Sequence, residues 1–152
     1  MGLQETLLAD LKTAMLARDE LKTRVLRSIK AALLEKEVSI RSGGEANLTE
    51  DMVMDVLIKA TKQRKDSLSQ FEAAGREDLA SIEREELEII GSYLPKTLSE
   101  EELALEVKQA IESLGATSPA DMGKVMAYLT PKLKGRADGA LISQMVRSQL
   151  QK

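Results

Sequence analysis

Apolar residues recur at the spacing of an α-helix over almost the whole of this 152-residue chain. Residues three or four positions apart fall on one side of a helix, so each run of this kind predicts a helix with one buried face. No segment shows the strict alternation that is typical of a half-buried strand. The sequence therefore predicts an all-α protein in which helices pack against helices.

Glycine, proline and polar capping residues divide this pattern into seven predicted helices. Four longer ones have their apolar faces at 7–15, 25–33, 53–71 and 79–94. Three shorter ones have theirs at 103–114, 122–129 and 141–150. Because proline disfavours helix in the residue before it, the break at Leu94–Pro95 predicts a domain boundary. We expect an N-terminal four-helix part over residues 1–95 and a small three-helix C-terminal domain over 96–152.

Short motifs predict where the later helices begin and end. Ser99 followed by Glu102 is typical of a capping box, in which the two residues bond to each other's backbone N–H groups. Pro119 is placed to open the sixth helix at its first position. Pro131 and Gly135 are expected to end that helix.

The chain contains neither histidine nor cysteine. These absences exclude disulfides, thiol catalysis, the commonest general base and the commonest zinc ligand. Carboxylates within residues 83–88 would be candidates for acid–base catalysis, but a charge run on a helix is more often a solvated face. Gly123–Lys124 lacks the upstream glycine and following hydroxyl residue of a phosphate loop. We therefore predict no catalytic residue, no metal and no cofactor.

The chain also lacks the sequence features of a membrane or secreted protein. No apolar run is long enough to span a bilayer. The first residues lack the basic region and apolar core of a signal peptide. We expect a cytoplasmic protein with no membrane partner.

Four cations occur from residue 124 to 136 with no acid among them, although the net charge of the chain is −3. They are Lys124, Lys132, Lys134 and Arg136. One interpretation is phosphate contact, because a turn containing Gly135 lets a polyanion approach closely. The other is a solvated turn whose cations favour the C-terminus of the sixth helix. If Asp138 caps the next helix, a phosphate would meet the cationic side chains rather than the helix N–H groups.

Two residues do not fit the pattern around them. Gly123 lies inside a predicted helix, where glycine costs about 1 kcal/mol relative to alanine, so either a neighbouring helix or a ligand backbone is expected to approach it. Arg64 falls on the apolar face of the third helix, where an arginine extends its head to solvent or pairs with a carboxylate. Glu83 and Glu86 are its candidate partners.

The chain has only three aromatic residues, Phe71, Tyr93 and Tyr128. Proteins that bind single strands usually stack bases on rows of aromatic side chains, which this chain does not contain. A pI near 5.2 also argues against indiscriminate coating of nucleic acid. If the chain binds nucleic acid, we expect it to recognise the shape and phosphates of a structured RNA, and we expect no DNA ligand.

Taken in order, these motifs resemble the GatB/YqeY family, and the resemblance covers essentially the whole chain. Its most specific segments are KQRKDS at 62–67, GREDLA at 75–80, residues 83–95, MGKVM at 122–126 and LKGRADG at 133–139. The family is similar to the tail of the B subunit of the glutamine-dependent tRNA amidotransferase, which helps convert misacylated Glu-tRNA or Asp-tRNA to the amidated form.

The resemblance implies a tRNA-contacting appendage without the ATP-using catalytic domain of that subunit, for which this chain is too short. It favours Lys124, Lys132, Lys134 and Arg136 as an RNA-facing set. An alternative function is a helical protein-interaction module that docks on an amidotransferase or an aminoacyl-tRNA synthetase. A third is a true component of the amidotransferase, a carbon–nitrogen ligase, but we expect no amidation by this chain alone.

Overall fold

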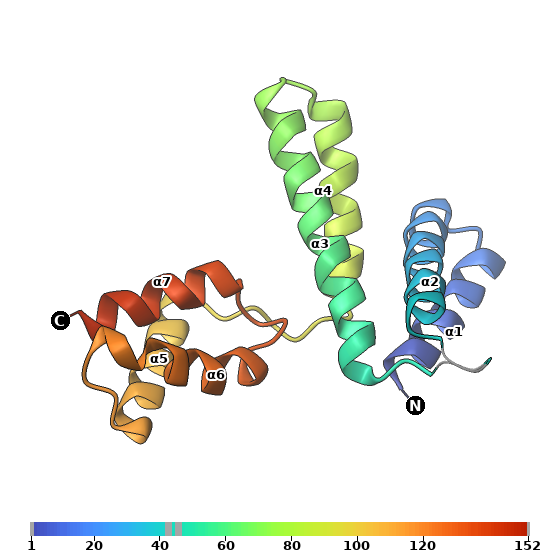
Figure 1. Ribbon diagram of the computed structural model, residues 1–152. Coiled ribbons are helices and arrows are strands. Elements are labelled where there is room, and N and C mark those ends of the chain that lie inside the picture. The colour runs from blue at the N-terminus through green and yellow to red at the C-terminus, as the bar shows by residue number, and fades with distance from the viewer. Residues whose placement is uncertain (1, 42–43, 45–46, 152) are drawn as a thin grey trace. The chain divides into compact units, whose positions relative to one another are not determined.

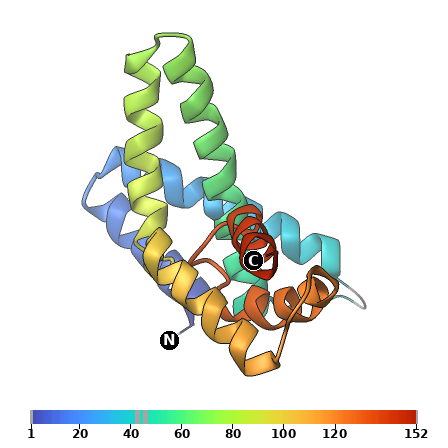
Figure 2. The same ribbon diagram turned by 90° about the vertical axis from the view of Figure 1, so that its left-hand side faces the viewer.

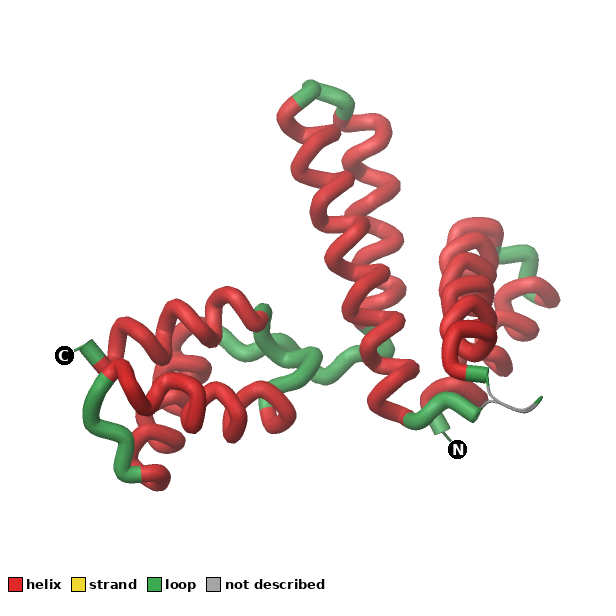
Figure 3. Tube along the Cα trace, in the orientation of Figure 1, coloured by secondary structure: helices red, strands yellow, loops and turns green. Residues whose placement is uncertain are grey.

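The computed structural model describes residues 2–41, 44 and 47–151, and every regular element in these ranges is helical (Figures 1 and 3). The prediction of an all-α fold is therefore confirmed. The α-helices are α1 (Leu3–Leu16), α2 (Glu20–Ile40), α3 (Glu50–Ala73), α4 (Glu77–Gly91), α5 (Glu100–Leu114), α6 (Met122–Lys132) and α7 (Gly139–Leu150). A single 3-10 turn, Pro119–Asp121, precedes α6.

The chain divides into two compact units, here called the N-terminal unit (Met1–Leu94) and the C-terminal unit (Pro95–Lys152). In the N-terminal unit, α1 and α2 form one antiparallel helical hairpin, and α3 and α4 form a second (Figures 1 and 2). In the C-terminal unit, α7 packs against both α5 and α6. Each unit has its own apolar core.

The core of the N-terminal unit lies where the two hairpins meet. Its buried residues are Leu7, Leu11, Val25, Leu26, Ile29, Leu33, Val53, Val56, Leu57, Ala60 and Ile90. Between residues 61 and 89, Ala80 alone is fully buried. The outer half of the α3–α4 hairpin is therefore held by half-buried side chains, and its polar contacts contribute correspondingly more to its stability.

A polar network on the α3–α4 hairpin explains why Arg64 lies on the apolar face of α3. The Nε of Arg64 lies 3.4 Å from Oε2 of Glu86, and Arg24 of α2 lies 3.4 Å from the other oxygen of the same carboxylate. Arg64 also donates to the carbonyl of Ala60 at 3.2 Å and to the hydroxyl of Ser28 at 2.9 Å. The prediction of Glu86 as a partner is confirmed, and the network joins α2, α3 and α4.

Helix boundaries follow the capping motifs with two exceptions. Ser99 and Glu102 form the expected capping box. The predicted start at Pro119 is wrong because Pro119–Asp121 forms a separate 3-10 turn and α6 begins at Met122. Pro131 does not end α6, which continues to Lys132. The helix continues past Pro131, which lacks an N–H donor, and the N–H of Leu133 still donates to the carbonyl of Leu129 at 2.8 Å.

Candidate nucleic-acid interface

The last residue of α6 and the four residues that follow it, 132–136, form a fixed turn that is here called the basic turn. Leu133, the second residue of this turn, is completely buried in the core of the C-terminal unit. The N–H of Arg136 donates to the carbonyl of Leu133, and the carbonyl of Arg136 accepts from the N–H of Leu98, both at 2.9 Å. Gly135 has a φ of 78°, a conformation that glycine adopts without strain. These contacts hold Lys132, Lys134 and Arg136 on one short, ordered segment.

Lys124 lies apart from the basic turn. It is in the first turn of α6, and Lys132 lies eight positions further along the same helix, about 12 Å along the helix axis. Its Nζ donates to the carbonyl of Leu114, the last residue of α5, at 3.1 Å. A cation in this position satisfies a free carbonyl and favours the negative end of the helix. The structure therefore gives Lys124 a local structural role and does not bring it together with the other three cations.

Lys132 is paired with an acid of α5. Its Nζ lies 3.2 Å from Oε2 of Glu106 and 5.6 Å from the ring centroid of Tyr128. Contact with the Glu106 carboxylate raises the pKa of Lys132 above its usual value. The Lys132 side chain remains 47% exposed, so solvent screens the pair and Lys132 stays accessible to a competing anion.

Arg136 and Lys134 are half-buried in the same turn. The pKa of Glu102 lies below its usual range, chiefly because the backbone and side chain of Ser99 donate hydrogen bonds to it, with smaller contributions from the charges of Lys96 and Arg136. Glu102 and Glu106 therefore lie near the basic turn, one helical turn apart on α5. This acidic edge was not predicted from the sequence, although the four-residue spacing of the two glutamates places them on one helix face.

Gly123 is an open position in α6. A Cβ added there would meet no atom of the described residues within 4 Å, beyond its own helix and chain neighbours. The expectation that a neighbouring helix packs closely against Gly123 is therefore wrong. The other expectation, that a ligand backbone approaches this residue, stays a prediction.

Replacing Gly123 with alanine is expected to raise the free energy of unfolding of the C-terminal unit by about 0.5–1 kcal/mol, because alanine restricts the unfolded chain and has room in the helix. Urea unfolding followed by circular dichroism measures the change. Gly115→Ala is the matched control, and it should destabilise because Gly115 ends α5 at a φ of 64°. Destabilisation by Gly123→Ala would contradict an open position at this site.

The described residues contain no group of three or more acidic side chains placed to hold a metal ion. Across the same part of the chain, no helix is long and apolar enough to cross a membrane. The feature that remains in the C-terminal unit is a group of cations on an ordered turn with one neighbouring aromatic side chain, Tyr128.

Comparison with known proteins identifies the family that the chain resembles. A family model described as "Yqey-like protein" matches residues 4–150. The relatives include "Altered inheritance of mitochondria protein 41, mitochondrial" of Saccharomyces cerevisiae, 36% identical over 107 residues, which are 69% of this chain and 56% of that protein. The protein of the same name from Kluyveromyces lactis is 33% identical over 150 residues, 94% of this chain and 79% of that protein. The chain thus spans just over half the length of the Saccharomyces relatives that it matches.

The names of these relatives contradict the cytoplasmic location expected from the sequence. They are called mitochondrial proteins, in Saccharomyces, in Kluyveromyces and in Lachancea thermotolerans, where the relative is 30% identical over 146 residues. The expectation was wrong because it depended on the lack of a secretory signal and of an apolar span, and neither feature separates the cytoplasm from the interior of an organelle.

Proposed function

The chain belongs to the Yqey-like protein family, and from this premise we propose that it is an accessory protein that binds tRNA or another structured RNA. The family is related to the tail of the tRNA amidotransferase B subunit, which supports RNA as the ligand. In this proposal the C-terminal unit is a three-helix RNA-binding domain and the N-terminal unit is a separate four-helix domain. The protein has no catalytic role of its own.

The observation that carries the proposal is the ordered basic turn. Its three cations lie on a segment that is anchored by the buried side chain of Leu133 and by a backbone hydrogen bond between Leu98 and Arg136. Because the turn is already ordered, little conformational entropy is lost when an anion binds. The Lys132 side chain is 47% exposed although it is paired with Glu106, so a phosphate can reach it and form a charge-assisted contact.

Tyr128 adds an apolar surface beside these charges. Its side chain is exposed, and Lys132 lies over its ring. One exposed aromatic ring next to a cation suits a single unpaired base in a structured RNA, since base–aromatic stacking contributes about 1–3 kcal/mol for each base. A single ring does not support an extended row of stacked bases. The arrangement therefore favours a folded RNA such as tRNA over an unstructured strand.

Replacing Lys132, Lys134 and Arg136 together with alanine is expected to weaken tRNA binding about tenfold or more at moderate salt, because each cation neutralises a phosphate. The plot of log affinity against log salt should lose a slope of roughly 2–3. Filter binding or fluorescence anisotropy with unmodified tRNA, repeated across a salt series, measures both quantities.

The matched control is the triple variant Lys59→Ala, Lys62→Ala and Lys65→Ala, which removes the same charge from exposed positions of α3. It should leave the salt slope nearly unchanged. Equal losses in the two triple variants would mean that overall charge, and not the basic turn, determines binding. Equal affinity and slope in the wild type and the basic-turn variant would refute the proposal.

A further inference from the structure

Large apolar side chains are exposed along the α1–α2 hairpin. Five of the eight exposed large hydrophobic side chains in the described residues belong to these two helices. They are Leu8, Met15, Leu16, Leu34 and Val38, and Leu16 is 78% exposed. Scattered exposed leucines need no explanation, but a concentration of them on one hairpin is typical of an interaction surface.

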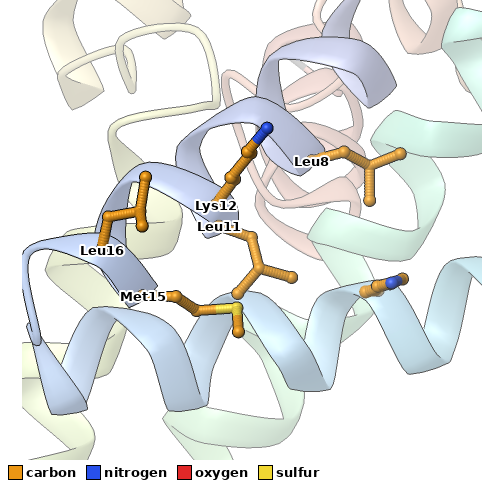
Figure 4. Close-up of a pocket in the computed structure, with 6 residues that line it drawn as sticks. Leu8, Leu11, Lys12, Met15 and Leu16 are labelled. Atoms are coloured by element: carbon orange, nitrogen blue, oxygen red, sulfur yellow. The ribbon is translucent and has the colours of Figure 1, made fainter.

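Part of this surface is concave. A hollow of about 340 Å³ lies against α1 and is lined by Leu8, Leu11, Lys12, Met15, Leu16 and Lys30 (Figure 4). Figure 4 shows Leu11 and Met15 directed from α1 toward α2, where they form the apolar floor. A groove between two helices is a common seat for the apolar face of a third helix, whose side chains enter it at every third or fourth residue.

Cations surround the apolar floor. Lys12 and Lys30 line the hollow itself, and a second hollow of about 500 Å³ shares Met15 with it. The charged residues lining the second hollow are Arg18, Glu20, Arg24 and Arg27. Within the described part of the chain, Arg24 alone among these five cations forms an ion pair, with Glu86. The rim therefore carries a strong positive excess.

Three nearby acids are held away from the cations by hydrogen bonds to neutral donors, although they keep their negative charges. Asp10 accepts a hydrogen bond of 2.6 Å from the hydroxyl of Tyr93. Asp19 caps α2 by accepting from the N–H of Lys22. Glu37 accepts from the side-chain amide of Gln4 at 2.9 Å. With every acid counted, residues 2–41 contain eight Lys and Arg against six Asp and Glu, so the hairpin has a net charge of +2.

We propose that the α1–α2 hairpin is a docking site for an acidic amphipathic helix of a partner protein. Leucine-like side chains of that helix would fill the apolar hollow, and its flanking carboxylates would meet Lys12, Lys30 and Arg27. The cationic rim argues for an acidic partner, since an apolar groove alone would not determine the sign of the partner's charge. The proposal goes beyond RNA binding by the C-terminal unit and does not depend on it.

Two other occupants fit the surface less well. A bilayer surface favours a convex apolar face with aromatic side chains at its edge, and this surface is hollow and has no aromatic lining residue. A nucleic acid would meet the cations but would leave the exposed leucines without an apolar partner. The concave apolar floor with a cationic rim therefore favours a protein helix.

A library of displayed helical peptides tests the proposal whatever the identity of the partner protein. Peptides of about 14 residues, roughly 21 Å long as helices, carry fixed leucines three and four positions apart and a random choice of Glu, Lys, Gln and Ser beside them. They are selected on the full chain after depletion on Leu16→Glu, a variant with a charge at an exposed position. The control is Leu105→Glu, which changes an exposed leucine on α5.

We expect the retained peptides to be rich in Glu beside the leucines. They should bind the wild type and Leu105→Glu alike, and bind Leu16→Glu about tenfold or more weakly. The double variant Lys12→Glu and Lys30→Glu should select Lys-rich peptides instead. Circular dichroism serves as the control that each variant is folded.

Three results would overturn the proposal. The first is selection of peptides with no excess of acid, or of none that distinguishes the wild type from Leu16→Glu. The second is binding to phosphatidylserine vesicles that Leu16→Glu abolishes while no peptide is retained, which would identify a membrane surface. The third is a dimer in sedimentation that Leu16→Glu dissociates, which would identify a second copy of this chain as the occupant.

Discussion

Replacing Arg64 with methionine is expected to lower the free energy of unfolding of the N-terminal unit by about 2–3 kcal/mol. The substitution keeps most of the side-chain volume but removes the cation that three polar partners share. Glu86, whose side chain is 12% exposed, would retain only Arg24, whose side chain is 59% exposed. The hydroxyl of Ser28 would lose its donor at the same time. Breaking such a pair leaves the Glu86 carboxylate in a partly desolvated site, which is more costly than losing a surface contact.

The same substitution should make stability depend on pH. Burial, assisted by the negative charge of Glu86, already raises the pKa of Glu83 above its usual value, and Arg64 opposes that shift. Without Arg64 the folded-state pKa of Glu83 rises further, so ionisation of Glu83 destabilises the folded state more. The loss in free energy of unfolding that Arg64→Met causes should therefore be greatest at pH 7. It should shrink as the pH falls toward about 4, where the carboxylates bind protons in the unfolded chain as well.

Urea unfolding with amide hydrogen exchange of α3 and α4 measures this effect. The control is Arg84→Met, because Arg84 is an exposed arginine paired with Glu77 and Glu72, and its loss should lower the free energy of unfolding much less than the loss of Arg64. A second variant, Arg64→Met with Glu86→Leu, removes both charges and should recover much of the stability. Equal losses in Arg64→Met and Arg84→Met would show that the network is no stronger than a surface pair.

Replacing Leu133 with alanine is expected to destabilise the C-terminal unit by about 3 kcal/mol, since Leu133 is completely buried and its loss leaves a cavity. Leu105→Ala removes the same atoms from an exposed position of α5 and should change stability by less than about 0.5 kcal/mol. Thermal unfolding of both variants gives the comparison. A small effect of Leu133→Ala would mean that the basic turn is not anchored by the side chain of Leu133.

Leu133→Ala should also weaken RNA binding, although it changes no charge. The side chain of Leu133 fixes the turn that carries the cations on either side of it, so the folded variant must order that turn when an anion binds. The measurement is tRNA affinity at a temperature at which circular dichroism shows the variant to be folded. Unchanged affinity under that condition would show that RNA binding does not depend on the order of the turn.

The helices were predictable because their signals are local. Leu103, Val107 and Ala110 share one face of α5 by spacing alone, and all three are buried. Ser99 and Glu102 fix the start of that helix by direct bonds between close neighbours. The end of α6 was less predictable, because Leu133, just past Pro131, is fixed by burial in a core formed by distant residues. Local propensity describes the proline but not that burial.

The candidate site was predictable only in part for the same reason. The sequence shows Lys132, Lys134 and Arg136 close together, and the structure holds them on one turn. The sequence does not show that Lys124 bonds to a carbonyl of α5, or that Glu106 of α5 lies beside Lys132. Both contacts are between residues far apart in the sequence, so a count of charge along the chain overstates how much of the charge is unpaired.

The central claim is that RNA contacts the basic turn, and a titration of the isotope-labelled full chain with tRNA, followed by NMR, tests it most directly. We predict that amide signals of residues 132–136 and of Leu98, whose N–H bonds to Arg136, shift or broaden first, and that raising the salt concentration reverses the change. Signals of α3 and α4 should stay in place. Changes confined to the N-terminal unit, or no change at any salt concentration, would contradict the claim.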